Sequence, residues 1–291
     1  TVISCFAISY SSSSMIYLCL DIFIEHDSSD VETGKIRSTY LTSVNLAWLA
    51  SPWLASMIIG ESDHWKVYFV AVCIMMPILL MISYNLKGFK DPQYVNFSMI
   101  KSIKELGQRK DIKNVFVSNF ILQFFYSCMV VYSPIYLSQY VGFNWKEIGL
   151  IFSIMLLPFV LIQIPLGKLA DKRFGEKEML TIGFIIMGIS TAIIPLITGK
   201  NFWIWALVLF ITRVGAATVE VMTDVYFFKK IGEKDVNLIS FYRTTSSFAY
   251  VFAPLFAIVF LSLFNIEYMF FVLGIFMFFG LRYSLALNDT K

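Results

Sequence analysis

The sequence predicts an all-α polytopic membrane protein, and three observations lead to that fold class. Hydrophobic residues make up 58% of the 291 positions, charged residues make up only 15%, and the mean hydropathy is +0.72. Soluble domains are far less apolar. The apolar residues gather in runs of the roughly 20 residues that a helix needs to cross a bilayer. The basic residues, finally, collect on one side of these runs.

Nine apolar runs follow one another along the chain, and we expect a transmembrane helix at each. They cover residues 2–23, 39–59, 66–86, 114–136, 146–166, 179–198, 202–228, 240–263 and 265–287. The chain opens on Thr1, without a basic segment before the first run, so we interpret that run as a span and not as a signal peptide. We also expect the sequence to be truncated at its N-terminus.

The connection between the third and fourth runs divides the chain into two parts. It is long and polar, carries seven basic residues and holds an amphipathic piece around residues 97–106. We therefore expect an incomplete N-terminal half with three spans at 1–86, a cytoplasmic linker at 87–113 and a C-terminal half with six spans at 114–291.

The basic residues set the orientation of these spans. Of the 23 lysines and arginines, Lys66, Lys146 and Lys200 fall on one side and Arg213 lies inside a run, which leaves 19 for the opposite side. Cytoplasmic loops carry the excess of basic residues in membrane proteins. The linker is therefore predicted to be cytoplasmic.

A dense polar block at residues 167–180, GKLADKRFGEKEML, separates the fifth and sixth runs. Its pattern, G-x-L-A-D-K-x-x-G-x-K, resembles the signature loop of the major facilitator superfamily of secondary transporters, which there joins the second and third helices of a six-helix half. The alternative is that its four basic residues only anchor two helix ends on the cytoplasmic side.

An internal repeat supports the same resemblance. Residues 10–55 and 213–257 match in their small and polar residues, with Asp21 aligned to Asp224 and Pro52 to Pro254. In the superfamily two six-helix halves are related by such a repeat. The resemblance implies that the nine runs correspond to helices four to twelve of a twelve-helix fold.

Polar residues inside three runs follow the period of a helix, at offsets near 0, 4, 7 and 11 or 14. The stripes comprise Tyr10, Ser14, Tyr17 and Asp21 in the first run, Asn119, Gln123, Tyr126 and Ser133 in the fourth, and Arg213, Ala217, Glu220 and Asp224 in the seventh. By the resemblance these runs are helices four, seven and ten, which line the central pathway. Such residues are costly in lipid and mark a protein interior or a cavity.

Arg213 and Glu220 are the candidates for coupling. Arg213 lies about eleven residues into its run, roughly mid-membrane. Burial favours the protonated form of the Glu220 carboxyl, whereas Arg213 on the same stripe favours the ionised form. Glu220 could therefore exchange a proton when solute displaces its partner. The alternative is a permanent ion pair between the two side chains.

The resemblance also implies a cytoplasmic gate at the signature loop. Its residues would be Gly167, Asp171, Lys172, Arg173 and Gly175 of the loop, together with Asp21 and Asp224 at helix ends. Asp171 would approach the start of the helix that begins near Ser38, whose free N–H groups carry partial positive charge. Lys172 or Arg173 would pair with Asp224.

We predict secondary transport of a small solute by alternating access, by a monomer in the plasma or inner membrane, with proton coupling through Arg213 and Glu220 as the hypothesis for its driving force. The alternative is a membrane sensor or scaffold with the same fold. An enzyme is disfavoured because neither H-E-x-x-H nor G-x-S-x-G occurs, and no phosphate-binding G-x-x-x-x-G-K-[ST] is present. The four cysteines are scattered in apolar runs. We therefore expect no metal site and no cofactor. The basic residues lie in clusters that flank the apolar runs and not on one amphipathic face, so we expect no nucleic-acid partner.

Overall fold

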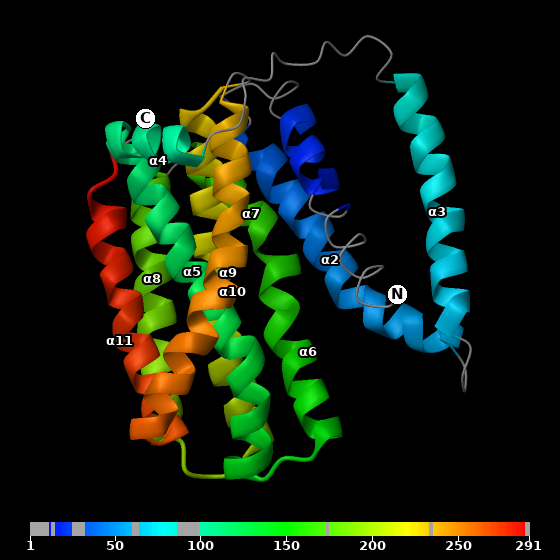
Figure 1. Ribbon diagram of the computed structural model, residues 1–291. Coiled ribbons are helices and arrows are strands. Elements are labelled where there is room, and N and C mark those ends of the chain that lie inside the picture. The colour runs from blue at the N-terminus through cyan, green and yellow to red at the C-terminus, as the bar shows by residue number, and fades with distance from the viewer. Residues whose placement is uncertain are drawn as a thin grey trace.

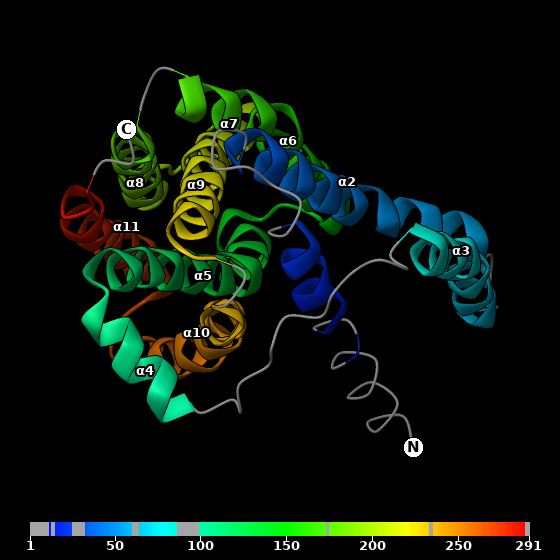
Figure 2. The ribbon, with the colours of Figure 1, turned by 90° about the horizontal axis from the view of Figure 1, so that it is seen from above.

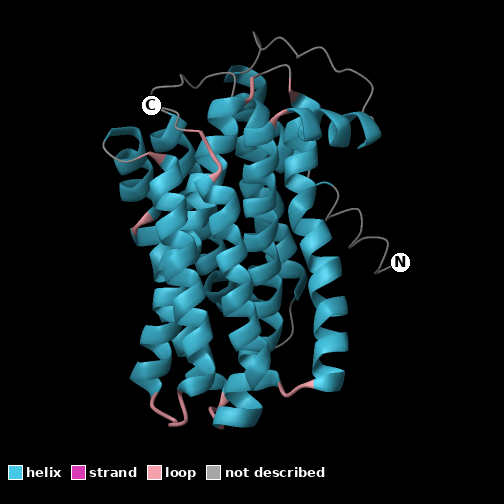
Figure 3. Cartoon of the chain, turned by 90° about the vertical axis from the view of Figure 1, so that its left-hand side faces the viewer, coloured by secondary structure: helices cyan, strands magenta, loops and turns pink. Residues whose placement is uncertain are grey.

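The computed structural model describes residues 12, 15–24, 33–59, 64–85, 99–172, 175–232 and 235–288. Every regular element within these ranges is helical, and the ranges contain no strand (Figure 3). The elements are Met15–Ile24, α2 Thr33–Ile59, α3 His64–Asn85, α4 Met99–Gln108, α5 Lys110–Tyr136, the π-helix Leu137–Val141, α6 Trp145–Leu161, α7 Gln163–Lys172, α8 Glu176–Ile193, the 3-10 turn Ile194–Leu196, α9 Phe202–Lys230, α10 Val236–Leu263 and α11 Ile266–Leu285. The predicted all-α class is confirmed.

Helices cover most of the described residues of all nine predicted spans. Six of them are long and apolar enough to cross a membrane. These are Lys110–Val141, Trp145–Ala170, Glu176–Leu196, Phe202–Lys230, Asn237–Leu263 and Ile266–Leu285. All six lie after the linker, in the segment for which six spans were predicted.

The α9 helix occupies the centre of the C-terminal bundle, where α5, α6 and α8 pack around it (Figures 1 and 2). Small residues allow helices in lipid to approach closely. A Cβ atom at Gly215 of α9 would lie 2.6 Å from the Met187 nitrogen and 2.8 Å from the Gly183 oxygen of α8. This position therefore requires glycine. Further along α9, the side chains of Val221 to Phe228 are all buried.

The fifth predicted span is a broken helix. The α6 helix ends at Leu161, Ile162 forms a turn, and α7 begins at Gln163. Pro158 lies in the last turn of α6 and Pro165 in the first turn of α7. Proline has no N–H to donate and disrupts the preceding helical turn. The break at Ile162 is followed directly by Gln163, whose side chain is fully buried.

The N-terminal segment, the described residues up to 85, packs against fewer helices than the bundle does. The α2 helix packs along α6, α7 and α9, whereas α3 stands apart from the bundle (Figures 1 and 2). Apolar side chains of α3 are consequently exposed, among them Tyr68 at 74% and Leu80 at 71%. The α2 helix begins at Thr33 rather than near Ser38. Its first turns therefore carry Lys35 and Arg37 into the helix instead of leaving them in a loop.

The predicted linker contains a helix of its own. The α4 helix, Met99–Gln108, covers the amphipathic piece and packs against α5 and α10. The α5 helix starts at Lys110, four residues before the predicted span. The last residues of the predicted linker, from Lys110 on, thus belong to the α5 helix.

Candidate functional site

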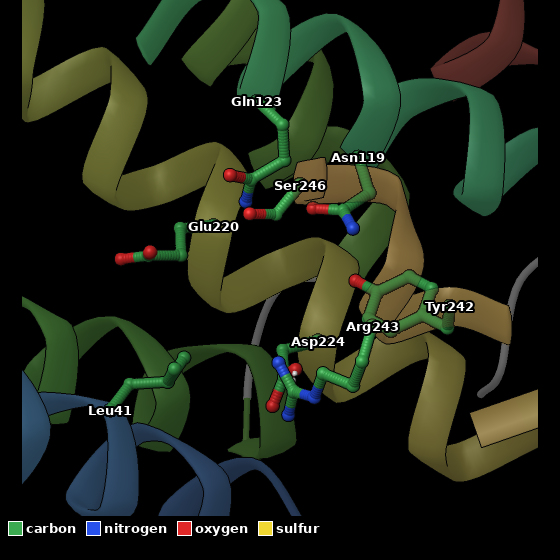
Figure 4. Close-up of a pocket in the computed structure, with 8 residues that line it drawn as sticks. All are labelled: Leu41, Asn119, Gln123, Glu220, Asp224, Tyr242, Arg243 and Ser246. Carbon is green, nitrogen blue, oxygen red and sulfur yellow. Dashed lines mark ion pairs between the residues drawn. The ribbon is translucent and has the colours of Figure 1, made fainter. Parts of the chain in front are cut away.

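A polar cavity lies between the N-terminal segment and the C-terminal bundle. It has a volume of about 510 Å³, and we call it the central cavity. Its lining comes from Met15–Ile24, α2, α5, α9 and α10, and consists of Tyr17, Tyr40, Leu41, Val44, Asn45, Trp48, Gln123, Glu220, Arg243, Ser246 and Ser247. A smaller pocket adjoins it and shares Glu220 and Arg243 with it (Figure 4). The two cavities bring together helices that are more than 200 positions apart in sequence.

Four charged side chains meet at the end of this cavity that the basic residues predict to be cytoplasmic, and we call Asp21, Arg37, Asp224 and Arg243 the inner charge cluster. Arg37 donates from Nη1 to Asp21 Oδ1 at 2.8 Å. Arg243 donates from Nε to Asp21 Oδ2 at 2.5 Å and from Nη2 to Asp21 Oδ1 at 2.7 Å. The same Nη2 lies 3.3 Å from Asp224 Oδ1. One carboxylate of the N-terminal segment is thus held by an arginine from each part of the chain.

Burial makes these contacts strong and makes their loss costly. The side chains of Asp21 and Arg37 are fully buried. The Arg37 guanidinium also lies 3.1 Å above the Phe228 ring of α9, a cation–π contact. A buried charge is tolerated only when it is paired and hydrogen-bonded, and removal of one partner typically costs about 3–5 kcal/mol. The cluster is therefore a latch between Met15–Ile24 and α2 on one side and α9 and α10 on the other.

Glu220 lies one turn from Asp224 on α9 but has different partners. Its Oε2 accepts hydrogen bonds from Gln163 Nε2 at 2.6 Å and from Asn45 Nδ2 at 3.4 Å. Asn45 Nδ2 also donates to Gln163 Oε1 at 3.2 Å. We call these three residues the amide cluster. No ion pair to Glu220 occurs within the described part of the chain, and in Figure 4 its carboxylate points away from Arg243.

Arg213 does not pair with Glu220, which corrects the alternative of a permanent ion pair. Its side chain is only 2% exposed, and its guanidinium packs on the rings of Phe125 at 5.4 Å and Tyr126 at 5.6 Å. Among the described residues nothing accepts a hydrogen bond from its Nε. Seven residues of helix separate Arg213 from Glu220, about 10 Å of rise. A shared helix face therefore does not imply contact.

The other predicted pathway residues have separate positions. Gln123 and Tyr17 line the central cavity, and Asn119 donates to Thr245 Oγ1 at 3.1 Å beside it. Tyr126 lies deeper, with its hydroxyl 3.5 Å from the Ala216 oxygen. Ser133 is buried against the Met129 sulfur and does not line either cavity. Tyr10 and Ser14 lie outside the described residues.

The signature loop packs on the start of α2. A Cβ atom at Gly167 would overlap the Ser38 side chain and the Gly34 carbonyl oxygen, so this close approach requires glycine. Gly175 is the N-cap of α8. The side chains of Asp171 and Lys172, and all of Arg173, lie outside the described residues, so their predicted contacts stay predictions. Asp224 is instead close to Arg243.

Sequence reasoning missed four residues that contribute to this site. They are Arg37, Asn45, Gln163 and Arg243. Asn45, Gln163 and Arg243 were inside predicted spans, where a polar side chain is expensive, and that rule alone could have marked them. The helical stripes did not include them because the stripes were drawn only in the first, fourth and seventh runs, and none of these four residues lies in those runs.

Comparison with known proteins places this geometry in a family. The family model described as the Major Facilitator Superfamily matches residues 115–289. Among solved structures, the chain is similar to a bacterial homologue of the iron transporter ferroportin in an outward-facing state, with a TM-score of 0.71 and 12% identity. The alignment covers 90% of this chain and 65% of that one, so the chain spans just under two thirds of that relative. No protein with a curated description matches the sequence.

Proposed function

The chain belongs to the major facilitator superfamily, and we propose that it moves a small solute across the membrane by alternating access. One observation carries the proposal. The inner charge cluster joins the N-terminal segment to the C-terminal bundle at the cytoplasmic end of the central cavity, through the contacts of Asp21 with Arg243. A pathway between two bundles that is closed at one end by contacts between them is what alternating access requires.

Ion pairs suit a gate that must open repeatedly. When the two bundles separate on the cytoplasmic side, water can solvate Asp21 and Arg243, which repays part of the lost Coulomb energy. Apolar contacts of the same area gain nothing comparable from water. The inner charge cluster can therefore switch between two states that lie close in free energy, as rigid-body transitions need.

The signature loop supports the same gate. The α7 helix lies against the start of α2 at Gly167, so a movement of α7 is transmitted to the helix that carries Arg37. We expect Asp171, at the end of α7, to interact with the first turn of α2, where free N–H groups favour a negative charge. The loop then couples the C-terminal bundle to the latch.

A cysteine inside the cavity tests the proposal without knowledge of the solute. Ser246 lines both cavities, and we expect Ser246→Cys in a background without native cysteines to react with a membrane-impermeant thiol reagent from the outside. In inside-out vesicles it should be protected, and Asp21→Asn should remove that protection. Equal reactivity from both sides in the unmodified background would contradict alternating access.

We further propose that Glu220 is the proton-carrying group, because its carboxylate lines the cavity and is bonded to amides instead of to a base. Infrared difference spectra of the purified protein should show a protonated-carboxyl band on acidification. That band should be missing in Glu220→Gln and retained in Glu147→Gln, a matched change on the opposite side of the membrane. A band unaffected by Glu220→Gln would remove Glu220 from proton transfer.

A further inference from the structure

We infer that the solute of the central cavity is an organic monocation whose charge binds Glu220 and whose apolar body lies against Tyr17, Tyr40 and Trp48. This inference rests on the proposed transport function and names the substrate class of that site. The features that carry it are the balance of charge around the cavity, the unused oxygen of Glu220, and the size and lining of the cavity.

Among the residues that the structure describes, the charges around the cavity do not balance. Three carboxylates, Asp21, Glu220 and Asp224, face two guanidinium groups, Arg37 and Arg243. Both arginines contact Asp21, and Arg243 also approaches Asp224. The inner charge cluster is therefore internally paired. The negative charge left over belongs to Glu220, the only one of the three carboxylates without an arginine within 4 Å.

Arg213 does not supply the missing positive charge at contact distance. Its guanidinium packs on the rings of Phe125 and Tyr126, and Arg213 does not line either cavity. It lies about 10 Å further along α9, at 1.5 Å of rise per residue. A cation bound at Glu220 would therefore meet a carboxylate that no protein side chain neutralises directly.

The hydrogen bonds of Glu220 leave one oxygen available. Gln163 and Asn45 both donate to Oε2, and no described residue donates to Oε1. The two amides come from α7 and α2 and fix the direction of the carboxylate, which reduces the entropy that a ligand must lose to bind it. An organic cation that approached Oε1 would make the close charge contact that no described residue makes.

Part of the cavity wall is aromatic. Tyr17, Tyr40 and Trp48 come from Met15–Ile24 and α2, whereas Glu220 comes from α9. Aromatic faces attract cations, and alkylated ammonium groups are commonly bound by several such rings. The volume of about 510 Å³ falls within the roughly 300–1,000 Å³ of small-molecule sites. The cavity is thus suited to an organic cation and is far larger than a bare metal ion needs.

Equilibrium dialysis of the purified full protein with labelled benzyltrimethylammonium tests this inference. Unlabelled benzyltrimethylammonium should displace the label, whereas benzyl alcohol and benzoate, which keep the ring but lack the positive charge, should not. Loss of one close charge contact is expected to weaken binding in Glu220→Gln by about ten-fold or more. Glu220→Asp keeps the charge and should lose less. Glu147→Gln, the same change outside the cavity, should bind as the unmodified protein does.

A second variant keeps the test valid if Glu220→Gln misfolds. Trp48 is 68% exposed, so Trp48→Ala should leave the fold intact. It should still weaken cation binding several-fold, about the value of one cation–π contact. The inference is overturned if benzoate or benzyl alcohol competes as well as the cation, if Mn²⁺ alone displaces the label, or if both variants bind normally. Because Ser246→Cys reports gating without any ligand, failure here is distinguishable from failure of the transport proposal.

Discussion

Asp224 and Glu220 lie one turn apart on α9, yet the protein surrounds them differently. Asp224 is 2% exposed and faces Arg243 of α10, whereas Glu220 receives two amide hydrogen bonds and lines the central cavity. A carboxylate that pairs with an arginine of another helix holds the two helices together. Amide donors stabilise the charge but leave it uncompensated, and therefore open to a proton or a cation. One helix thus supplies one acid to the gate and another to the solute site.

The largest effect on stability should come from Arg243→Leu, because Arg243 contacts both Asp21 and Asp224. Its removal leaves Asp224 without its closest base and Asp21 with only Arg37. We expect a loss of about 3–5 kcal/mol, the usual cost of breaking a buried pair. Thermal unfolding in detergent measures it. The exposed Arg282→Leu at the end of α11 is the control, and an equal loss in both variants would argue against a special role of the cluster.

The two gate carboxylates should differ from each other. Asp21→Asn removes charge-assisted bonds to two arginines and should cost about 1–3 kcal/mol. Asp224→Asn should cost less than about 1 kcal/mol, since one of its oxygens, Oδ2, is buried and accepts no hydrogen bond from any described residue. Unfolding curves of the two isosteric variants provide the comparison. If Asp224→Asn is the more damaging, the latch does not centre on Asp21.

Glu220→Gln should change stability little although it abolishes the charge of the cavity. A glutamine oxygen can still accept from Gln163 and Asn45, so we expect a change within about 1 kcal/mol. Unfolding of the ligand-free protein measures this change in stability separately from any effect on binding. A loss as large as that of Asp21→Asn would show that Glu220 is structural and would remove the contrast with the gate.

The smallest effect should come from an ion pair outside the spans. Arg109 donates to Asp235 at 2.9 Å, and this hydrogen bond raises the pKa of Arg109 above its ordinary value. Arg109 is therefore charged at neutral pH. The Arg109 side chain is 41% exposed, and such surface pairs contribute at most about 1 kcal/mol. Arg109→Gln should therefore shift unfolding slightly at low salt and not at high salt. A shift that salt does not reduce would place this pair with the buried cluster.

The sequence was sufficient to predict where the helices lie along the chain. It was insufficient to predict which helices and side chains contact one another. Apolar length located the long apolar helices to within about six residues at their ends, because lipid imposes length and composition on any segment that crosses it. It did not locate α4, which lies in the polar linker. The break at Ile162 was not predicted, although Pro158 and Pro165 were visible, since prolines in membrane helices often leave the helix continuous. Apolar length also gave no sign that α3 would stand apart while α9 is buried.

The charge contacts were the hardest part to predict. The offsets of the stripes marked Asp21, Asp224 and Glu220, and in the structure the first two are buried while Glu220 lines the central cavity. They could not identify Arg243 as the partner of Asp21, because 222 positions separate the two residues. The predicted stripe of Arg213 and Glu220 shared a face and still produced no ion pair, since a rise of about 10 Å exceeds the reach of that contact.

A distance between the two sides of the gate tests the central claim most directly. Spin labels at Thr39→Cys on α2 and Gly232→Cys after α9 occupy exposed positions, and nothing lies within 4 Å of a Cβ atom at Gly232. With the native cysteines replaced, double electron–electron resonance should give one short distance population in the otherwise unmodified protein. Asp21→Asn should add a longer population, and Arg109→Gln should not. An unchanged distance distribution in Asp21→Asn would contradict the claim that the inner charge cluster holds the cytoplasmic side closed.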